Sequence, residues 1–430
     1  MAGTRETDQM FRRIVVVSVV TGAVMLALYG VVVKTNTAIV TMSLVSRYLP
    51  VHPADVTATT AINGLPQAIQ RSSPGQLLSY AQLSTPHHLV TTMHPSSVRM
   101  AGPEASGINA TSGKMVKVKP SPYIIYRCLK GHLCGGYADR QKGIVAGYVM
   151  SIMTGRGFGI EMNKPCELST FLSPNEVDWI VSPETHKLKS QTLKKLDRSA
   201  NPLRQKLATA DVSKIFTENI TYLTLNIEFV RYLKKNNIHR NNLGWIVNAS
   251  LGEVYARSWR TLFRLKDPLQ KDLDKFLSLV PRNYSLICAQ IRMGKNPSIP
   301  NDSETRNDDK SVKTIWTFLE QYNDTSKYKI FVSTDSENIR KESLRRFPNN
   351  SVTLPGVIAH VDKAPQCDGF RKVILDQEAL SHCDTLLITN SGLGRIAAFF
   401  RQREDNMYCF MKRQLTKCNY TSPEFMPMNW

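Results

Sequence analysis

Short apolar runs alternate with amphipathic stretches along the chain beyond residue 120. This pattern predicts strands and helices in turn. In the C-terminal part we expect strands at 284–291, 328–334 and 385–390, and helices at about 315–319, 336–347, 373–382 and 392–402. An earlier unit has a strand at 123–128, a glycine-rich turn, a helix and a strand at 156–162. Continuous apolar runs separated by helices are typical of parallel sheets covered on both faces, so we expect an α/β fold.

A different hydrophobic pattern stands near the N-terminus. Residues 14–33 carry no charge, and a run of this length can cross a bilayer as one α-helix. The run is longer than the apolar core of a cleaved signal peptide. Three arginines precede it, whereas Lys34 and Arg47 follow it, which favours a cytoplasmic tail at 1–13. We therefore expect an uncleaved signal anchor and a single-pass type II membrane protein.

The polar segment that follows has no sustained periodicity. Residues 34–120 are rich in Ser, Thr, Pro and Ala, which is typical of an extended stem, although an ordered extension packed on the following domain is the alternative. N-glycosylation sequons occur only beyond the anchor, at Asn109, Asn219, Asn248, Asn283, Asn301, Asn323, Asn349 and Asn419. Anchor, stem and a domain of about three hundred residues match the layout of Golgi enzymes, so we expect this domain to lie in the lumen.

The eight cysteines also lie beyond the anchor. In an oxidising compartment an even number favours disulfides over metal ligands. Cys128 with Cys134, and Cys409 with Cys418, are close enough for small loops, but the sequence leaves the pairing open. Cys288 lies in an apolar run, where a buried free thiol is an alternative.

Lys and Arg outnumber Asp and Glu by 55 to 35. Such an excess suits nucleic acid, an anionic membrane surface or phosphorylated small molecules. No zinc-finger spacing, RNA-binding motif or basic repeat accompanies the charge, so we expect no nucleic-acid partner. A phosphate-bearing substrate remains, although a basic surface needs no ligand.

Polar and glycine residues follow each of the three C-terminal strands. In a parallel sheet, ligands bind at the carboxyl ends of the strands. Arg292 has the donor fork that matches phosphate oxygens, Ser391 and Gly392 begin a helix that favours an anion, and Asp335 can accept hydrogen bonds from a ribose or a base. The residues at these ends that we expect to contact a nucleotide are Gln290, Arg292, Thr334, Asp335, Asn390, Ser391, Gly392 and Arg395.

The glycine turn at 135–143 offers a second set of candidates. Gly135, Gly136 and Arg140 are placed with the donor-binding residues, on the expectation that this loop faces the three strand ends across a cleft. The ordinary alternatives are a surface ion pair for an arginine and a helix-stabilising role for Asp139 or Asp335.

Four segments in order resemble a known family. They are GGYADRQKGIVAGYVMSIMTGR, CAQIRMG, FVSTDS and HCDTLLITNSGLGRIAAFF. The series resembles the GDP-fucose-dependent fucosyltransferases of the GT-B fold, which include α1,2-, α1,6-, protein O- and plant xyloglucan enzymes, over roughly residues 121–411. Gln-Ile-Arg at 290–292 is similar to the xyloglucan branch, whereas several relatives have histidine at Gln290 and arginine at Met293.

The resemblance implies two Rossmann-like lobes, an N-terminal acceptor lobe at 121–275 and a C-terminal donor lobe at 276–430. It also implies that Arg292 grips the donor diphosphate and that Ser391 and Arg395 close over GDP. Such enzymes generally invert the sugar without a metal, and no metal or other cofactor is expected here. The Asp-x-Asp of Asp272 and Asp274 is interpreted as a solvated helix face.

A correctly placed carboxylate would assist the attack as a base, and Glu304, Asp302 and Asp139 are the candidates. The leading hypothesis is therefore a Golgi fucosyltransferase acting on a glycan or glycoprotein acceptor, with terminal galactose and an α1,2 linkage as the first choice.

Protein O-fucosylation, core α1,6-fucosylation and a different nucleotide sugar are alternatives within the enzyme class. An inactive lumenal glycan-binding protein is the alternative outside it. A sulfotransferase fits the anchor and the charge, but the chain lacks a phosphate-cradling loop after its first strand.

Overall fold

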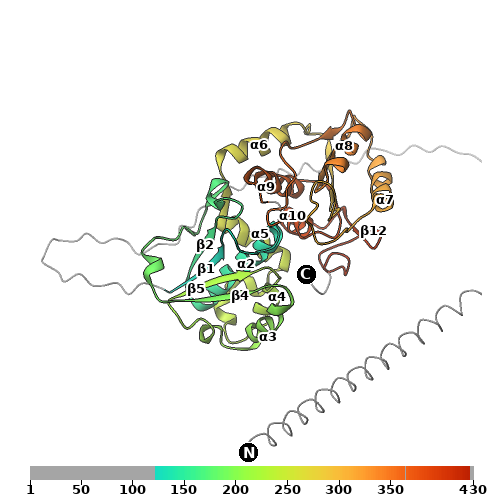
Figure 1. Ribbon diagram of the computed structural model, residues 1–430. Coiled ribbons are helices and arrows are strands. Elements are labelled where there is room, and N and C mark those ends of the chain that lie inside the picture. The colour runs from blue at the N-terminus through green and yellow to red at the C-terminus, as the bar shows by residue number, and fades with distance from the viewer. Residues whose placement is uncertain (1–121, 364, 427–430) are drawn as a thin grey trace, which may run out of the picture. The chain divides into compact units, whose positions relative to one another are not determined.

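The structure is a computed structural model that describes residues 122–363 and 365–426. The predicted tail, anchor and stem lie outside these residues. Within the described part of the chain, no helix is both long and apolar enough to cross a membrane. The described chain forms two α/β lobes (Figure 1).

The N-terminal lobe is built on a four-stranded sheet in the order β2-β1-β5-β4, with every pair parallel. Its strands are β1 (Tyr123–Cys128), β2 (Gly157–Met162), β4 (Ser190–Lys195) and β5 (Ile220–Leu225). Helix α2 (Tyr137–Thr154) joins β1 to β2 and packs on one face of the sheet. A Cβ at Gly143 would lie 2.2 Å from the carbonyl oxygen of Leu225, so glycine is needed for this close packing.

Shorter elements complete this lobe. They are η1 (Leu168–Thr170), β3 (Leu172–Pro174), η2 (Thr185–Lys187), η3 (Asp197–Ala200), α3 (Asn201–Thr209), η4 (Val212–Lys214), α4 (Val230–Leu233), η5 (Arg240–Val247), α5 (Leu251–Leu262) and β6 (Phe263–Leu265). Strands β3 and β6 form a separate antiparallel pair.

The C-terminal lobe has a six-stranded sheet in the order β12-β11-β10-β7-β8-β9. Only β12 runs antiparallel to its neighbour. The strands are β7 (Ser285–Ile291), β8 (Tyr328–Thr334), β9 (Ser351–Val352), β10 (Thr385–Ile388), β11 (Met407–Met411) and β12 (Gln414–Lys417). The helices are α6 (Asp267–Ser278), α7 (Asp309–Glu320), α8 (Glu337–Arg346), α9 (Cys367–Ser381) and α10 (Gly392–Arg401).

The predicted α/β class with parallel sheets is confirmed, as are the predicted strands and helices of both units. Helix α9 begins at Cys367, before the expected 373, because its first turn carries polar residues that hide the apolar period. The strands β3, β4, β5, β6, β9, β11 and β12 were not predicted. Two of them are very short or half exposed, so their apolar signal is weak.

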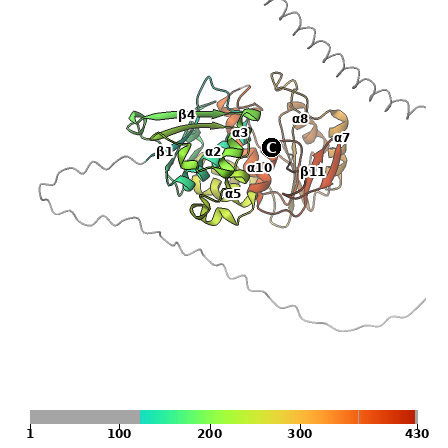
Figure 2. The same ribbon diagram turned by 90° about the horizontal axis from the view of Figure 1, so that it is seen from below.

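The lobes share one hydrophobic core that runs from Ile124 in β1 to Leu386 in β10. Helix α5 packs against α10, where the Tyr255 and Phe399 rings stack with centroids 5.4 Å apart. Figure 2 shows α10 at the junction of the two lobes. The predicted lobe boundary at 275 falls within α6, which packs on α9.

The interpretation of Asp272 and Asp274 as a solvated helix face holds in full for Asp274 alone. The Asp272 carboxylate is 32% exposed and forms an ion pair with Arg371, because α6 packs on α9. Asp274 accepts from Gln270 on the same helix, and this contact is exposed, as expected for a solvated face.

The predicted disulfides are present. The four bonds are Cys128–Cys134, Cys166–Cys367, Cys288–Cys383 and Cys409–Cys418. Cys128–Cys134 and Cys409–Cys418 are the two short-range pairs that the close spacing had suggested. The free-thiol alternative for Cys288 is wrong, because β7 places Cys288 next to Cys383. Cys166–Cys367 links the two lobes across a sequence separation of 201 residues.

Candidate functional site

The carboxyl ends of three neighbouring strands meet in the C-terminal lobe. Strand β7 lies between β8 and β10, with Ile291 in register with Thr334 and Gln290 in register with Ile388. The chain leaves β7 toward β8 on one side and returns to β10 on the other. This makes a topological switch point, where open α/β sheets bind ligands. The prediction that three strand ends lie together is confirmed.

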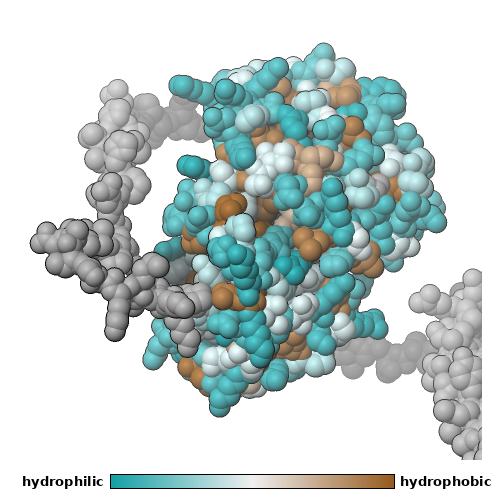
Figure 3. Space-filling view, turned by 60° about the vertical axis from the view of Figure 1, so that its left-hand side comes forward, coloured by the Kyte–Doolittle hydropathy of each residue, from teal (hydrophilic) through white to brown (hydrophobic). Residues whose placement is uncertain are grey.

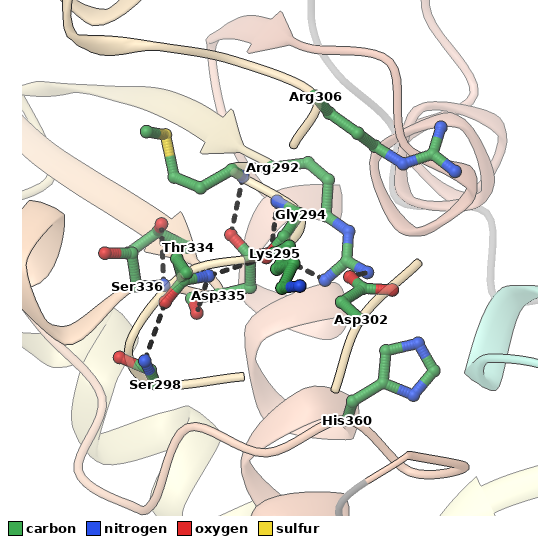
Figure 4. A network of polar contacts seen from close by, with 12 residues as sticks. Arg292, Gly294, Lys295, Ser298, Asp302, Arg306, Thr334, Asp335, Ser336 and His360 are labelled. Atoms are coloured by element: carbon green, nitrogen blue, oxygen red, sulfur yellow. Dashed lines mark hydrogen bonds and ion pairs between the residues drawn. The ribbon is translucent and has the colours of Figure 1, made fainter. Parts of the chain in front are cut away.

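Arg292 is the centre of a polar network at this switch point (Figure 4). Its Nη1 donates to Asp335 Oδ2 at 2.6 Å, and its Nη2 donates to Asp302. Asp335 also accepts the backbone N–H groups of Met293 at 2.7 Å and Gly294 at 2.9 Å. Burial raises the pKa of Asp335, while Arg292 and these amides act to lower it. Asp335 therefore orients the arginine in this structure.

A loop at 294–306 leaves the end of β7 and returns to it. Gly294 has φ +78°, and a Cβ there would lie 2.1 Å from the carbonyl oxygen of Glu304, so glycine is required for the turn. The N–H of Arg306 donates to the carbonyl of Met293 at 2.8 Å, which closes the loop. Glu304, a candidate base, is 65% exposed and lies 3.3 Å from the Arg306 guanidinium.

Sequence reasoning missed Arg306. Burial and the nearby charge of Arg306 together lower the pKa of Arg395 to about 10. The Arg306 guanidinium is thus close enough to act on Arg395, in the first turn of α10, and two such neighbouring cations favour an anion. Only the return of the loop to β7 brings Arg306 there, so no sequence motif could have indicated it.

The start of α10 has no anion of its own among the described residues. Its N-cap Ser391 makes no side-chain capping bond, and its first turn contains no acidic residue. Arg395 is 3% exposed and donates to Asn390 Oδ1 at 2.9 Å and to the carbonyl of Phe425. Arg395 and Asn390 therefore hold the helix start and the C-terminal segment in place.

Two other predicted donor residues make internal contacts. Gln290 is 3% exposed, and its Oε1 accepts from Thr389 at 3.4 Å. Thr334 Oγ1 accepts the N–H of Ser336 at 3.2 Å, which shapes the turn after β8. Both side chains thus stabilise the strand ends through internal hydrogen bonds.

His360 was also missed. Its Nδ1 accepts the backbone N–H groups of Asp362 and Lys363, each at 3.2 Å, so the ring proton of the neutral form lies on Nε2. Burial, followed by the charge of Arg292, lowers the pKa of His360. His360 thus presents a neutral N–H donor beside Asp302 and Arg292 (Figure 4).

The fold that carries these strand ends is similar to that of solved fucosyltransferase structures. FUT1 of Arabidopsis thaliana, in a mutant form in complex with GDP, aligns at a TM-score of 0.50 with 11% identity, covering 70% of this chain and 73% of that one. This chain has the fold of that fucosyltransferase. NodZ alpha-1,6-fucosyltransferase, soaked with GDP-fucose, aligns at 0.48 with 15% identity, covering 70% of this chain and 99% of that one. POFUT1 in its apo form aligns at 0.37 with 10% identity over 71% and 99%.

Sequence comparisons add nothing to this likeness. No protein-family model matches the chain, and no curated protein matches its sequence.

Within this fucosyltransferase fold, the glycine turn of the N-terminal lobe does face the C-terminal site. A Cβ at Gly392 would lie 3.0 Å from the Cβ of Ala138, so the starts of α2 and α10 adjoin. Asp139, however, caps its own helix: Oδ2 accepts the N–H of Gly136 at 2.9 Å, and Oδ1 lies 2.8 Å from Lys142 Nζ. These contacts are those of a helix-stabilising residue, which was the alternative interpretation of Asp139.

Arg140 does not reach the C-terminal site. It is fully buried and donates to the carbonyls of Gly135, Lys164 and Val361. Asp362 lies 3.4 Å from Arg140 and 2.6 Å from Lys164 Nζ, and it accepts the N–H of Gly135 at 3.3 Å. Arg140 and Gly135 therefore join the lobes, and we leave both out of the proposed donor site.

The described residues hold no group of three or more His, Cys, Asp or Glu side chains suited to a metal ion. Of the sequons in the described part, Asn219 is half-buried, whereas Asn248, Asn283, Asn301, Asn323, Asn349 and Asn419 are exposed.

Proposed function

We propose that this protein transfers fucose from GDP-fucose to a glycan acceptor. The observation that carries the proposal is the pairing, at the switch point of a fucosyltransferase fold, of Arg292 with a helix start that has no anion of its own. A diphosphate supplies the missing anion.

The diphosphate would lie at the start of α10, where it would accept from the amides of residues 392–394 and pair with Arg306. Arg292 has five N–H donors, and its two carboxylate partners use only two of them. The others can donate to a phosphate oxygen while Asp335 keeps the guanidinium in place. These cations and amides stabilise the charge that develops on the leaving GDP, the role that a metal ion has in other transferases.

In the proposed step, the acceptor hydroxyl attacks C1 of fucose opposite the departing GDP. The bond from C1 to the diphosphate oxygen breaks, its electrons go to the diphosphate, and the configuration at C1 is inverted. The hydroxyl proton must pass to a base. Asp302 is bound to Arg292 and Asp139 caps α2, so Glu304 is the candidate whose carboxylate is accessible.

The cellular setting is part of the proposal. An anchor at 14–33 and a lumenal domain in the Golgi agree with the four disulfides, which need an oxidising compartment. The exposed sequons agree with the same location.

The test is release of the nucleoside diphosphate, GDP or UDP according to the donor, by the full chain in detergent micelles. GDP-fucose, GDP-mannose and UDP-galactose are each supplied with mixed neutral glycans. We expect release from GDP-fucose alone, with a loss in Arg306→Ala and none in Arg345→Ala, which changes an arginine that is 76% exposed. A folded sample that neither turns over nor binds GDP-fucose would contradict the proposal.

A second candidate is a lumenal glycan-binding protein without turnover. It is favoured by one observation: two carboxylates already occupy Arg292, which leaves fewer donors for phosphate than an unpaired arginine would have. Binding of glycan without binding of GDP-fucose would select this candidate.

A further inference from the structure

A cavity of about 430 Å³ lies in the N-terminal lobe, apart from the switch point of the other lobe. It opens at the carboxyl ends of β1 and β2, on the residues that follow these strands. Its polar lining includes Glu161, Asn163, Glu167 and His186, and its apolar lining includes Trp179 and Ile180. None of these residues belongs to the network around Arg292.

The polar floor of this cavity is rigid. Glu161 accepts from Arg127 Nε at 2.5 Å, and the Arg127 guanidinium stacks 3.1 Å from the centroid of the Tyr222 ring. His186 Nε2 lies 3.0 Å from Glu161, and its Nδ1 lies 3.0 Å from the Tyr222 hydroxyl. Arg127 on β1 and His186 on η2, which both contact Tyr222, thus hold the Glu161 carboxylate at the cavity wall, and such preorganisation lowers the cost of binding.

The apolar wall is held by the backbone. The N–H of Ile160 on β2 donates to the carbonyl of Trp179 at 3.0 Å, and the Trp179 indole N–H donates to the carbonyl of Leu262 at 2.8 Å. Ile180 follows Trp179 in the chain, and its side chain is 54% exposed. On the face drawn in Figure 3, hydrophobic residues form small separate patches in a mainly hydrophilic surface. Ile180 thus adds exposed apolar surface to the lining of the cavity.

The cavity adjoins the seam between the lobes. Asn163 in its wall precedes Lys164, whose Nζ donates to Asp362 at 2.6 Å. His360, two residues before Asp362, belongs to the network of Arg292. Residues 360–362 therefore connect the wall of this cavity to the network around Arg292.

The charge and polarity of the lining residues indicate which class of ligand the cavity can bind. Glu161 and Glu167 repel phosphate and sulfate, and the nearby guanidinium of Arg127 already pairs with Glu161. Carboxylates and amides pair well with hydroxyl groups, while the apolar wall suits the C–H face of a sugar ring. We propose that this cavity binds a neutral glycan, as the acceptor subsite of the proposed transferase.

The experiment uses the full chain in detergent micelles on an array that carries neutral galactose-terminated glycans and their sulfated counterparts. Wild type is compared with Ile180→Asp and Glu161→Gln. Ile238→Asp is the matched control, because Ile238 is 58% exposed in the same lobe and does not line the cavity. GDP-fucose affinity is measured on every sample by calorimetry.

We expect binding to the neutral glycans, about tenfold weaker in Ile180→Asp and in Glu161→Gln and unchanged in Ile238→Asp, with GDP-fucose affinity unchanged in all. No neutral glycan bound, or binding that neither variant weakens, would overturn the inference. The acceptor role rests on the proposed function, but the two can fail separately. Glycan binding that depends on Ile180 without any GDP-fucose binding would keep the cavity assignment and reject the transferase.

Discussion

Two helix starts, those of α2 and α10, follow the same local pattern of strand, glycine and helix, yet their electrostatics are opposite. At α2 the protein supplies its own anions: Asp139 accepts the N–H of Gly136, and Asp362 accepts those of Gly135 and Cys134. At α10 no side chain caps Ser391 and the first turn has no acid. A glycine-rich helix start is therefore a ligand site only where the fold has not already supplied an anion.

The largest effect is expected from breaking the α2 side. Asp362→Asn leaves the buried guanidinium of Arg140 and the ammonium of Lys164 without their carboxylate. We expect the free energy of unfolding to fall by about 3 kcal/mol, because removing one partner of a buried pair leaves the other charges buried and uncompensated. Urea unfolding under oxidising conditions measures it, with the exposed Asp405→Asn as control. Equal stability of both variants would show that Asp362 does not hold the seam.

On the α10 side, Arg292→Ala removes the guanidinium that we assign to the diphosphate. We expect kcat/KM for GDP-fucose to fall about 100-fold, as for loss of one charge-stabilising donor. Arg292→Lys keeps a charge but loses the fork, so we expect about a tenfold fall. Steady-state GDP release measures both. Full activity in Arg292→Ala would remove this residue from the donor site.

Leu393→Asp tests the contrast between the two helix starts most directly, because it gives α10 the acid that α2 already has. The new carboxylate competes with the diphosphate, and we expect about tenfold weaker GDP binding by calorimetry. Leu393→Asn makes the same loss of packing without the charge, and it should bind nearly as wild type. If the two variants bind GDP equally, the helix start is not the phosphate site.

Asp139→Ala separates a capping role from a catalytic one. Loss of the bond to Gly136 should lower stability by about 1 kcal/mol. Because the carboxylate is occupied by its helix, kcat should stay within about twofold of wild type. A kcat that falls a hundredfold at unchanged stability would instead make Asp139 the base.

The smallest effect is a pH dependence. Burial alone would raise the pKa of Asp362, but Lys164 and Arg140 outweigh it, and this pKa lies below its ordinary value. A depressed carboxyl pKa stabilises the fold above the unfolded value of about 3.9 and loses this effect as the pH falls through the folded pKa. The stability advantage of wild type over Asp362→Asn should therefore be constant from pH 7 to about 5 and shrink below about 4. A constant difference down to pH 2 would contradict this assignment.

The sequence predicted the parallel strands and the meeting of their ends because β-branched runs and switch points follow general rules. It placed Arg292, Asp335 and Ser391 at one edge for the same reason. It could not show that Asp302 returns to Arg292, that Arg306 approaches Arg395, or that Arg140 is buried at the seam. These contacts join residues from different loops, and local periodicity carries no information about where a loop returns.

The Cys166–Cys367 bond and the shared core bear on how a nucleotide would enter and leave. A wide rotation of one lobe against the other would have to break the packing of α5 on α10, while the covalent link limits how far the lobes separate. A nucleotide at the proposed site must therefore enter and leave without wide separation of the two lobes.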